Sequence, residues 1–127
     1  MKKIDKTYEI EAPVEKVWAC LTEVEQIEHW SDASASFDAK VGGKFKMWGD
    51  DSLSGKVNKL EKNRLLEEDW LVDGMDEPSI ALFELSEEDN VTILKLTHSN
   101  VPEDLVDELD EGWDLYYLGA IKDYLEN

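Results

Sequence analysis

Two short acidic runs are the part of this sequence that could supply general acid or base catalysis. They are Glu67-Glu68-Asp69 and Glu87-Glu88-Asp89. Catalysis by a carboxylic acid requires that one side chain lose solvent, because burial raises its pKa. In an extended strand Glu68 shares a face with Trp70, so it is the acid best placed to line an interior beside an aromatic ring. Charged side chains are mostly solvated, and we therefore expect Glu68 at the surface.

The other reactive side chains form no recognisable catalytic or metal-binding pattern. Cys20 lies at helical spacing among apolar residues, which predicts packing rather than nucleophilic chemistry. His98, near the end of a predicted strand, is typical of a hydrogen-bonded structural histidine, and His29 of a surface position. With one cysteine, two histidines and no HExxH motif, we expect no catalytic residue, no metal site and no cofactor.

The charge balance disfavours several classes of partner. The chain has 31 acidic and 13 basic residues, a formal net charge of -18 and a pI near 4.2. The electrostatic field of so negative a chain repels nucleic acids and anionic lipid headgroups. Arg64 is the one arginine of the sequence, so no arginine cluster can bind phosphate. No apolar run approaches the ~20 residues of a membrane span, and no signal-peptide core follows the first lysines. We expect a cytoplasmic protein with no nucleic-acid partner and no membrane span.

Hydrophobic periodicity predicts an α+β domain that occupies residues 1–127. Alternating apolar residues predict strands at residues 4–11, 44–48, 54–60, 64–72, 79–85 and 91–98, with a turn at 49–51. Helical spacing over residues 14–30 predicts two short helices joined by a tight bend, with Thr22 as the cap of the second. The absence of strand–helix alternation argues against a parallel sheet.

The C-terminal segment, residues 102–127, predicts a helix that other elements surround on several sides. Its second half carries apolar side chains around most of its circumference, and a helix of this kind is usually buried. A curved antiparallel sheet that grips the helix, with a cavity between them, would satisfy this pattern. Gly112 predicts a break between two helical pieces, or alternatively a hinge for a lid. Gly119 predicts a close approach of the helix to the sheet.

Four segments together resemble the START-like helix-grip (SRPBCC) superfamily, in the branch of the C-terminal domain of the activator of Hsp90 ATPase. They are IEAPVEKVWACLT (10–22) followed by His29-Trp30, VGGKF (41–45), SGKVNKLEKNRLLEEDW (54–70), and LTHSNV (96–101) leading to GWDLYYLGAIKDYLE (112–126). The resemblance implies a helix-grip fold: about seven curved antiparallel strands around a long C-terminal helix, with two short helices after the first strand. It also implies a hydrophobic cavity, since relatives bind lipids, hormones or polyketides and a few catalyse cyclisation or hydrolysis.

The resemblance leaves three functions open. The first is binding or carriage of a small apolar molecule such as a lipid, polyketide or aromatic compound, with a stress-related role as one option. The second is a cyclase- or dehydratase-like enzyme, and the third is a chaperone-associated interaction protein. The co-chaperone's separate Hsp90-contacting domain has no counterpart in this sequence, which weakens the third hypothesis.

The expected ligand-binding wall is largely aromatic. A tyrosine of the closing helix would orient a ligand's polar end, and two adjacent tyrosines point about 100° apart, so only one should face the cavity. The same side chains would equally fill a solid core. The candidate ligand-binding residues are Trp30, Phe45, Met47, Trp70, Phe83, Leu85, Leu96, Trp113, Tyr116, Tyr117 and Ile121.

Overall fold

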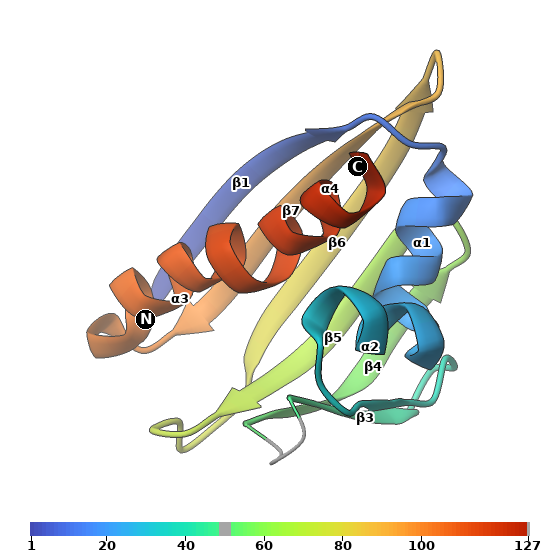
Figure 1. The fold of residues 1–127 in the computed structure, drawn as a ribbon. Coiled ribbons are helices and arrows are strands. Elements are labelled where there is room, and N and C mark those ends of the chain that lie inside the picture. Colours follow the sequence, from blue (N-terminus) through green and yellow to red (C-terminus); the bar gives the residue numbers. More distant parts are fainter. Residues whose placement is uncertain (49–51, 127) are drawn as a thin grey trace.

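The computed structural model describes residues 1–48 and 52–126, and it has the predicted α+β helix-grip architecture. A curved sheet of seven antiparallel strands wraps around the C-terminal helix, which lies across its concave face (Figure 1). The turn predicted at residues 49–51 lies outside the described part of the chain, as does Asn127. Among the described residues, no helix is long and apolar enough to cross a membrane.

The sheet joins the first strand of the chain to the last. The strand order is β1-β7-β6-β5-β4-β3-β2, so every pair except β1–β7 is adjacent in sequence, as short antiparallel connections favour. The strands are β1 (Lys2–Ile10), β2 (Ser36–Phe37), β3 (Lys44–Met47), β4 (Leu53–Glu61), β5 (Leu65–Val72), β6 (Ser79–Glu88) and β7 (Val91–Val101).

The helices lie on one face of this sheet (Figure 1). Two short helices follow β1, namely α1 (Val14–Thr22) and α2 (Val24–Ser31), as the sequence predicts. The C-terminal segment begins with a 3₁₀ turn, η1 (Glu103–Leu105), and continues through α3 (Val106–Gly112), a π-helical turn η2 (Trp113–Tyr117), and α4 (Leu118–Glu126).

Three local features differ from the sequence-based expectations. β2 was missed, because two residues carry no periodic signal. The strands predicted at 79–85 and 91–98 leave a longer connection at 86–90, whereas the observed β6–β7 turn consists of Asp89 and Asn90 alone. Their positive φ values of 52° and 63° suit a two-residue hairpin. Thr22 does not cap α2, because its hydroxyl donates to the Trp18 carbonyl oxygen one turn back in α1.

The C-terminal segment does not break at Gly112. Its backbone stays helical there, with φ -61° and ψ -36°. The irregularity comes one residue later, where the Leu118 N–H bonds to the Trp113 carbonyl five residues back and opens a π turn. A Cβ on Gly119 would lie 1.7 Å from the Asp114 carbonyl oxygen. Gly119 therefore accommodates the helix's own π turn rather than a close approach to the sheet.

Polar contacts fasten both ends of the C-terminal helix to β1. Lys6 pairs with Asp110 and Asp114, and the Tyr8 hydroxyl also donates to Asp114. Hydrogen bonds from Tyr8 and Lys6 hold the pKa of the Asp114 carboxyl below its usual value. At the other end the Lys122 ammonium donates to the Glu9 carbonyl oxygen at 2.6 Å. These contacts fix where the helix crosses the sheet.

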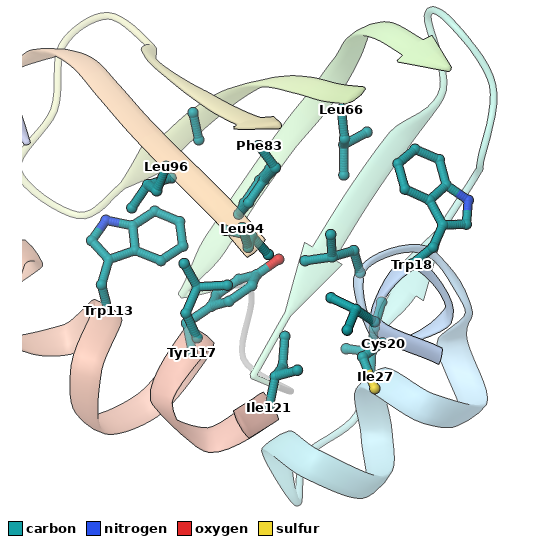
Figure 2. Packing of buried hydrophobic residues seen from close by; sticks show 14 of the residues in the cluster. Trp18, Cys20, Ile27, Leu66, Phe83, Leu94, Leu96, Trp113, Tyr117 and Ile121 are labelled. Carbon is teal, nitrogen blue, oxygen red and sulfur yellow. The ribbon is translucent and has the colours of Figure 1, made fainter. Parts of the chain in front are cut away.

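The core lies between the concave face of the sheet and the helices. In Figure 2, Trp113, Tyr117 and Ile121 project from the C-terminal helix toward Phe83, Leu94 and Leu96 of the sheet. Cys20 is fully buried among α1 and α2 side chains, which confirms the packing role that the sequence predicts. Burial and the nearby Glu23 charge raise the pKa of its thiol to about 12, so the thiolate is suppressed.

We predict opposite effects of one methyl group at the two helical glycines. Gly119→Ala should lower the free energy of unfolding by about 1–3 kcal/mol, because the π turn must shift to admit the new carbon. Gly112→Ala is the matched control: a Cβ there meets nothing within 4 Å, and it should stabilise the protein by about 0.5–1 kcal/mol. Urea unfolding measures both, and equal effects of the two substitutions would contradict the π-turn account.

Candidate functional site

A cavity of about 470 Å³ lies between the first half of the C-terminal helix and the ends of β3, β4 and β5. Its volume falls within the range typical of small-molecule sites. The side chains around it are mostly apolar or aromatic, with a few polar groups. The lining residues are Trp48, Ser52, Leu53, Trp70, Val72, Asp73, Leu105, Glu108, Leu109, Gly112, Trp113, Tyr116 and Tyr117.

Four aromatic rings form the inner wall of the cavity. The Trp70 and Trp113 indoles stack with centroids 4.5 Å apart and planes 22° apart. Tyr117 lies 4.9 Å from Trp113 and 5.5 Å from Trp70, and Trp48 meets Tyr117 edge-on at 6.0 Å. Interlocked rings of this kind hold their positions well, so the wall is preorganised.

A buried hydrogen-bond chain fixes the orientation of this wall. The Trp113 indole N–H donates to His98 Nδ1 at 3.1 Å, and His98 Nε2 lies 2.8 Å from Ser79 Oγ. Because an indole N–H can only donate, the neutral imidazole carries its proton on Nε2 and donates to Ser79. The Ser79 hydroxyl then donates to the Trp70 carbonyl oxygen. His98 is fully buried with both ring nitrogens hydrogen-bonded, which confirms the structural position expected from the sequence, and burial lowers its pKa to about 4.

Glu68 is a buried acid directly behind the aromatic wall. The sequence correctly predicts its face, but the expected solvated position is wrong, because the side chain is 0% exposed. Its Oε1 accepts a 2.8 Å hydrogen bond from the Trp70 indole N–H, whereas Oε2 has no partner. Burial raises the pKa of this carboxyl to about 8, although the Trp70 bond opposes the shift. The group is therefore largely protonated at neutral pH.

The candidate ligand-binding residues fall into two groups. Trp70, Trp113, Tyr116 and Tyr117 come together at the cavity, where Tyr117 is buried and Tyr116 is 65% exposed at the rim. The expectation that only one of the two tyrosines points inward agrees with this placement. The others are buried but do not line this cavity: Trp30, Phe45, Met47, Phe83, Leu85, Leu96 and Ile121.

Two of those buried residues support the wall from behind. Phe83 meets Trp113 edge-on with centroids 5.7 Å apart, and Trp30 lies 4.9 Å from Tyr117. Phe45 instead stacks on Phe37 at the far end of the sheet, at 5.4 Å. The filled-core interpretation thus describes most of the second group.

Several lining residues were not predicted. Trp48 is the last residue of the strand predicted at 44–48, but its φ of 62° ends β3 and turns the chain, so strand alternation does not determine where its side chain points. Leu105, Leu109 and Gly112 recur at spacings of four and three residues, a helical signal that the sequence contained. Among the described residues, no group of three or more potential metal ligands occurs.

Comparison with known proteins gives one family and several close folds. The family described as "Activator of Hsp90 ATPase homolog 1-like protein" matches residues 11–126. An HSP90 activator from Plasmodium falciparum superposes with a TM-score of 0.91 at 26% identity, over 99% of this chain and 97% of that one. The Aha1 dimer from Colwellia psychrerythraea gives 0.86 at 26% identity, with the same coverage.

A third similar structure is CalU16 from Micromonospora echinospora. Its TM-score is 0.83 at 29% identity, and the match covers 96% of this chain and 73% of that one. A comparison with curated proteins found no match.

The buried Glu68 predicts a specific dependence of stability on pH. Between pH 5 and 8 the unfolded chain ionises this residue while the folded protein keeps its proton, so unfolding releases a proton. The stability associated with Glu68 is full below its unfolded pKa and is lost as pH rises toward 8, by ~1.4 kcal/mol per pH unit. Glu68→Gln should remove this slope.

Urea unfolding of the wild type and the variant at pH 5, 6, 7 and 8 measures the difference. His98 works in the opposite direction: its stabilising effect grows from about pH 4 to 6.5. It is present in both proteins, so the difference between them isolates Glu68. Glu67→Gln, on the outer face of the same strand, is the control and should keep the wild-type slope. Parallel profiles for the wild type and Glu68→Gln would contradict the buried-acid assignment.

Proposed function

The chain belongs to the activator of Hsp90 ATPase homolog 1-like family, and we propose that it binds a small, mainly apolar molecule in the cavity beneath its C-terminal helix. The observation that carries this proposal is the 470 Å³ cavity with its preorganised aromatic wall. Its mostly apolar lining is hydrophobic surface that a bound apolar molecule would remove from water.

The cavity is suited to binding by burial of apolar surface. Leu105 and Leu109 of η1 and α3 are half-buried above it, opposite Leu53 and Val72 of the sheet. A ligand that covers these side chains gains roughly 25 cal/mol for each Å² of apolar surface removed from water, before ordering costs. Because the wall is already held by stacking and hydrogen bonds, little further ordering is needed on binding.

Interaction with an Hsp90-type chaperone is a second candidate function. It is favoured by the description of the matching family and by the similar HSP90 activator from Plasmodium falciparum, which this chain matches over nearly its full length. The described surface offers limited apolar area for such a partner. Leu115 and Tyr116 are exposed side by side on η2, whereas Val41 and Leu71 lie on other elements.

We predict that filling the cavity from the helix side abolishes ligand binding without unfolding the protein. Gly112 lines the cavity, and a Cβ there meets open space, so Gly112→Leu should occupy part of the volume. Affinity for N-phenyl-1-naphthylamine, a neutral fluorescent probe, should fall about tenfold or more. Trp113→Ala is a poorer test, because removing an indole that is 2% exposed should itself cost about 3–5 kcal/mol of stability.

The matched control is Glu111→Leu, at the exposed neighbouring position of the same helix. It adds the same side chain away from the cavity and should leave probe affinity unchanged. Urea midpoints of both variants confirm folding. Unchanged probe binding in a folded Gly112→Leu variant would overturn the cavity as the binding site.

The chaperone hypothesis predicts faster ATP hydrolysis by Hsp90 from the same source in the presence of this protein. Leu115→Asp/Tyr116→Asp should reduce that effect, because it places charge in the exposed apolar pair. The ATPase rate with increasing protein concentration is the measurement. No stimulation and no complex by sedimentation would exclude this second function and leave the ligand-binding proposal unaffected.

A further inference from the structure

The Glu68 carboxyl presents an unpartnered polar atom inside the core. Oε1 accepts from the Trp70 indole N–H, but no hydrogen bond reaches Oε2. A buried polar atom without a partner costs about 1–3 kcal/mol, and each such atom in a native protein calls for an explanation. Glu68 is also the one acidic side chain among the described residues that is fully buried.

The protonation of this carboxyl decides which partner it needs. Oε1 already accepts the hydrogen bond from the Trp70 indole N–H, and this N–H cannot accept a hydrogen bond from the carboxyl in return. The neutral acid therefore carries its O–H on Oε2, so the missing partner is a hydrogen-bond acceptor. A carbonyl oxygen is the simplest neutral acceptor that can enter an apolar site.

Glu68 lies next to two residues that form the cavity wall. Trp70 is its hydrogen-bond partner, and Tyr117 is close enough for the Glu68 charge to raise the pKa of its hydroxyl, in addition to the effect of burial. Both residues line the cavity, whereas Glu68 itself does not. Tyr117 belongs to the π turn η2, and single π turns occur frequently at functional sites. Trp70 and Tyr117 therefore separate the buried carboxyl from the cavity, and a ligand group reaches Oε2 where one of these rings is displaced.

We propose that Glu68, behind Trp70 and Tyr117, is a polar subsite that donates a hydrogen bond to the carbonyl oxygen of an otherwise apolar ligand. This inference rests on the proposed ligand-binding function and narrows its ligand class. The ligand is a neutral aromatic or polycyclic ketone, quinone or related carbonyl compound.

The charges around the cavity support a neutral ligand. Asp73 and Glu108 are at its edge, and none of the described lining residues is a lysine, arginine or histidine. A carboxylate ligand such as a fatty acid would meet two like charges and the field of a chain with net charge -18. A ketone has no such penalty, and its oxygen matches the donor on Glu68.

The test uses two rigid probes that differ only at one carbon: 9-fluorenone, which has a carbonyl group, and fluorene, which has a methylene. Wild-type protein should bind fluorenone about five- to tenfold more tightly than fluorene, as expected for one net buried hydrogen bond. Glu68→Leu should bind both probes equally, because it has no donor. Glu68→Gln should keep the preference, because its amide can accept from Trp70 and donate to the ketone. Glu67→Gln is the control and should behave as wild type.

A pH series gives a second readout that does not depend on the leucine variant folding. The preference of the wild type for fluorenone should disappear above pH 8 as Glu68 loses its proton, whereas Glu68→Gln should keep it. Across the sheet Glu68 faces Val57 and Ala81, which do not titrate. Among the other buried titratable groups, burial raises the pKa of Tyr117 in the C-terminal helix above its usual value and that of Cys20 in α1 to about 12, and it lowers the pKa of His98 in β7 to about 4. Among the described residues, Glu68 is the buried group whose pKa of about 8 lies in this window.

The outcomes separate the inference from the function on which it rests. Equal wild-type affinity for the two probes, or a preference that survives in Glu68→Leu, overturns the subsite and leaves the cavity function standing. A preference that persists above pH 8 in the wild type overturns it as well. If neither probe binds the wild type, the cavity function is contradicted and the inference falls with it.

Discussion

The stack of Trp113 on Trp70 is the contact on which the rest of this structure depends. The Trp113 indole lies flat against Trp70, meets Phe83 edge-on and donates its N–H to His98. One side chain of the C-terminal helix thereby engages three strands, β5, β6 and β7. It fixes the depth and direction of the helix, closes the inner end of the cavity, and covers the strand that carries Glu68.

The π turn is the local consequence of that constraint. The helix is also tied to β1 through Lys6 with Asp110 and Asp114, and through Lys122 farther along. A regular helix has one fixed rotation per residue, and one wider turn changes the angular relation between its two halves. Gly119 makes this possible because it leaves room for the Asp114 carbonyl. The aromatic pair Trp113 and Tyr117 lies in this turn, so the irregular segment coincides with the cavity wall.

The sequence predicts most of the fold because its signals are local and repeated. Alternation indicates the long strands, and a helix that is apolar around its circumference must be surrounded. The failures share a cause, which is the lack of a local pattern in the sequence. β2 has only two residues and is too short to show alternation. At Trp48 the backbone turns out of β3 with a positive φ, and no neighbouring residue indicates this turn. The cavity forms where small residues such as Gly112 leave space unfilled. This space can be recognised only after segments that are distant in the sequence have been packed against each other.

Glu68 illustrates the limit most clearly. Alternation places it on the inner face beside Trp70, and that placement is confirmed. The expectation of a solvated side chain came from the behaviour of acids in general, and it was overridden by the C-terminal helix, which arrives from residues far along the chain and removes water from this face. Local pattern can therefore assign the direction of a side chain but not what covers it.

Glu68 is buried as a neutral acid beside two residues of the cavity wall, so ligand binding in the cavity can be coupled to the protonation of Glu68. Trp70 and Tyr117 both line the cavity; Trp70 also donates a hydrogen bond to the carboxyl, and the Glu68 charge raises the pKa of the Tyr117 hydroxyl in addition to the effect of burial. Any ligand that accepts a hydrogen bond from the protonated acid must favour that protonated state, because binding and proton affinity are linked through the same free-energy cycle. The -18 charge of the chain stabilises the proton further, since it opposes one more negative charge. Glu68 can thus remain a hydrogen-bond donor at neutral pH, in an interior where an ionised carboxylate would be strongly disfavoured.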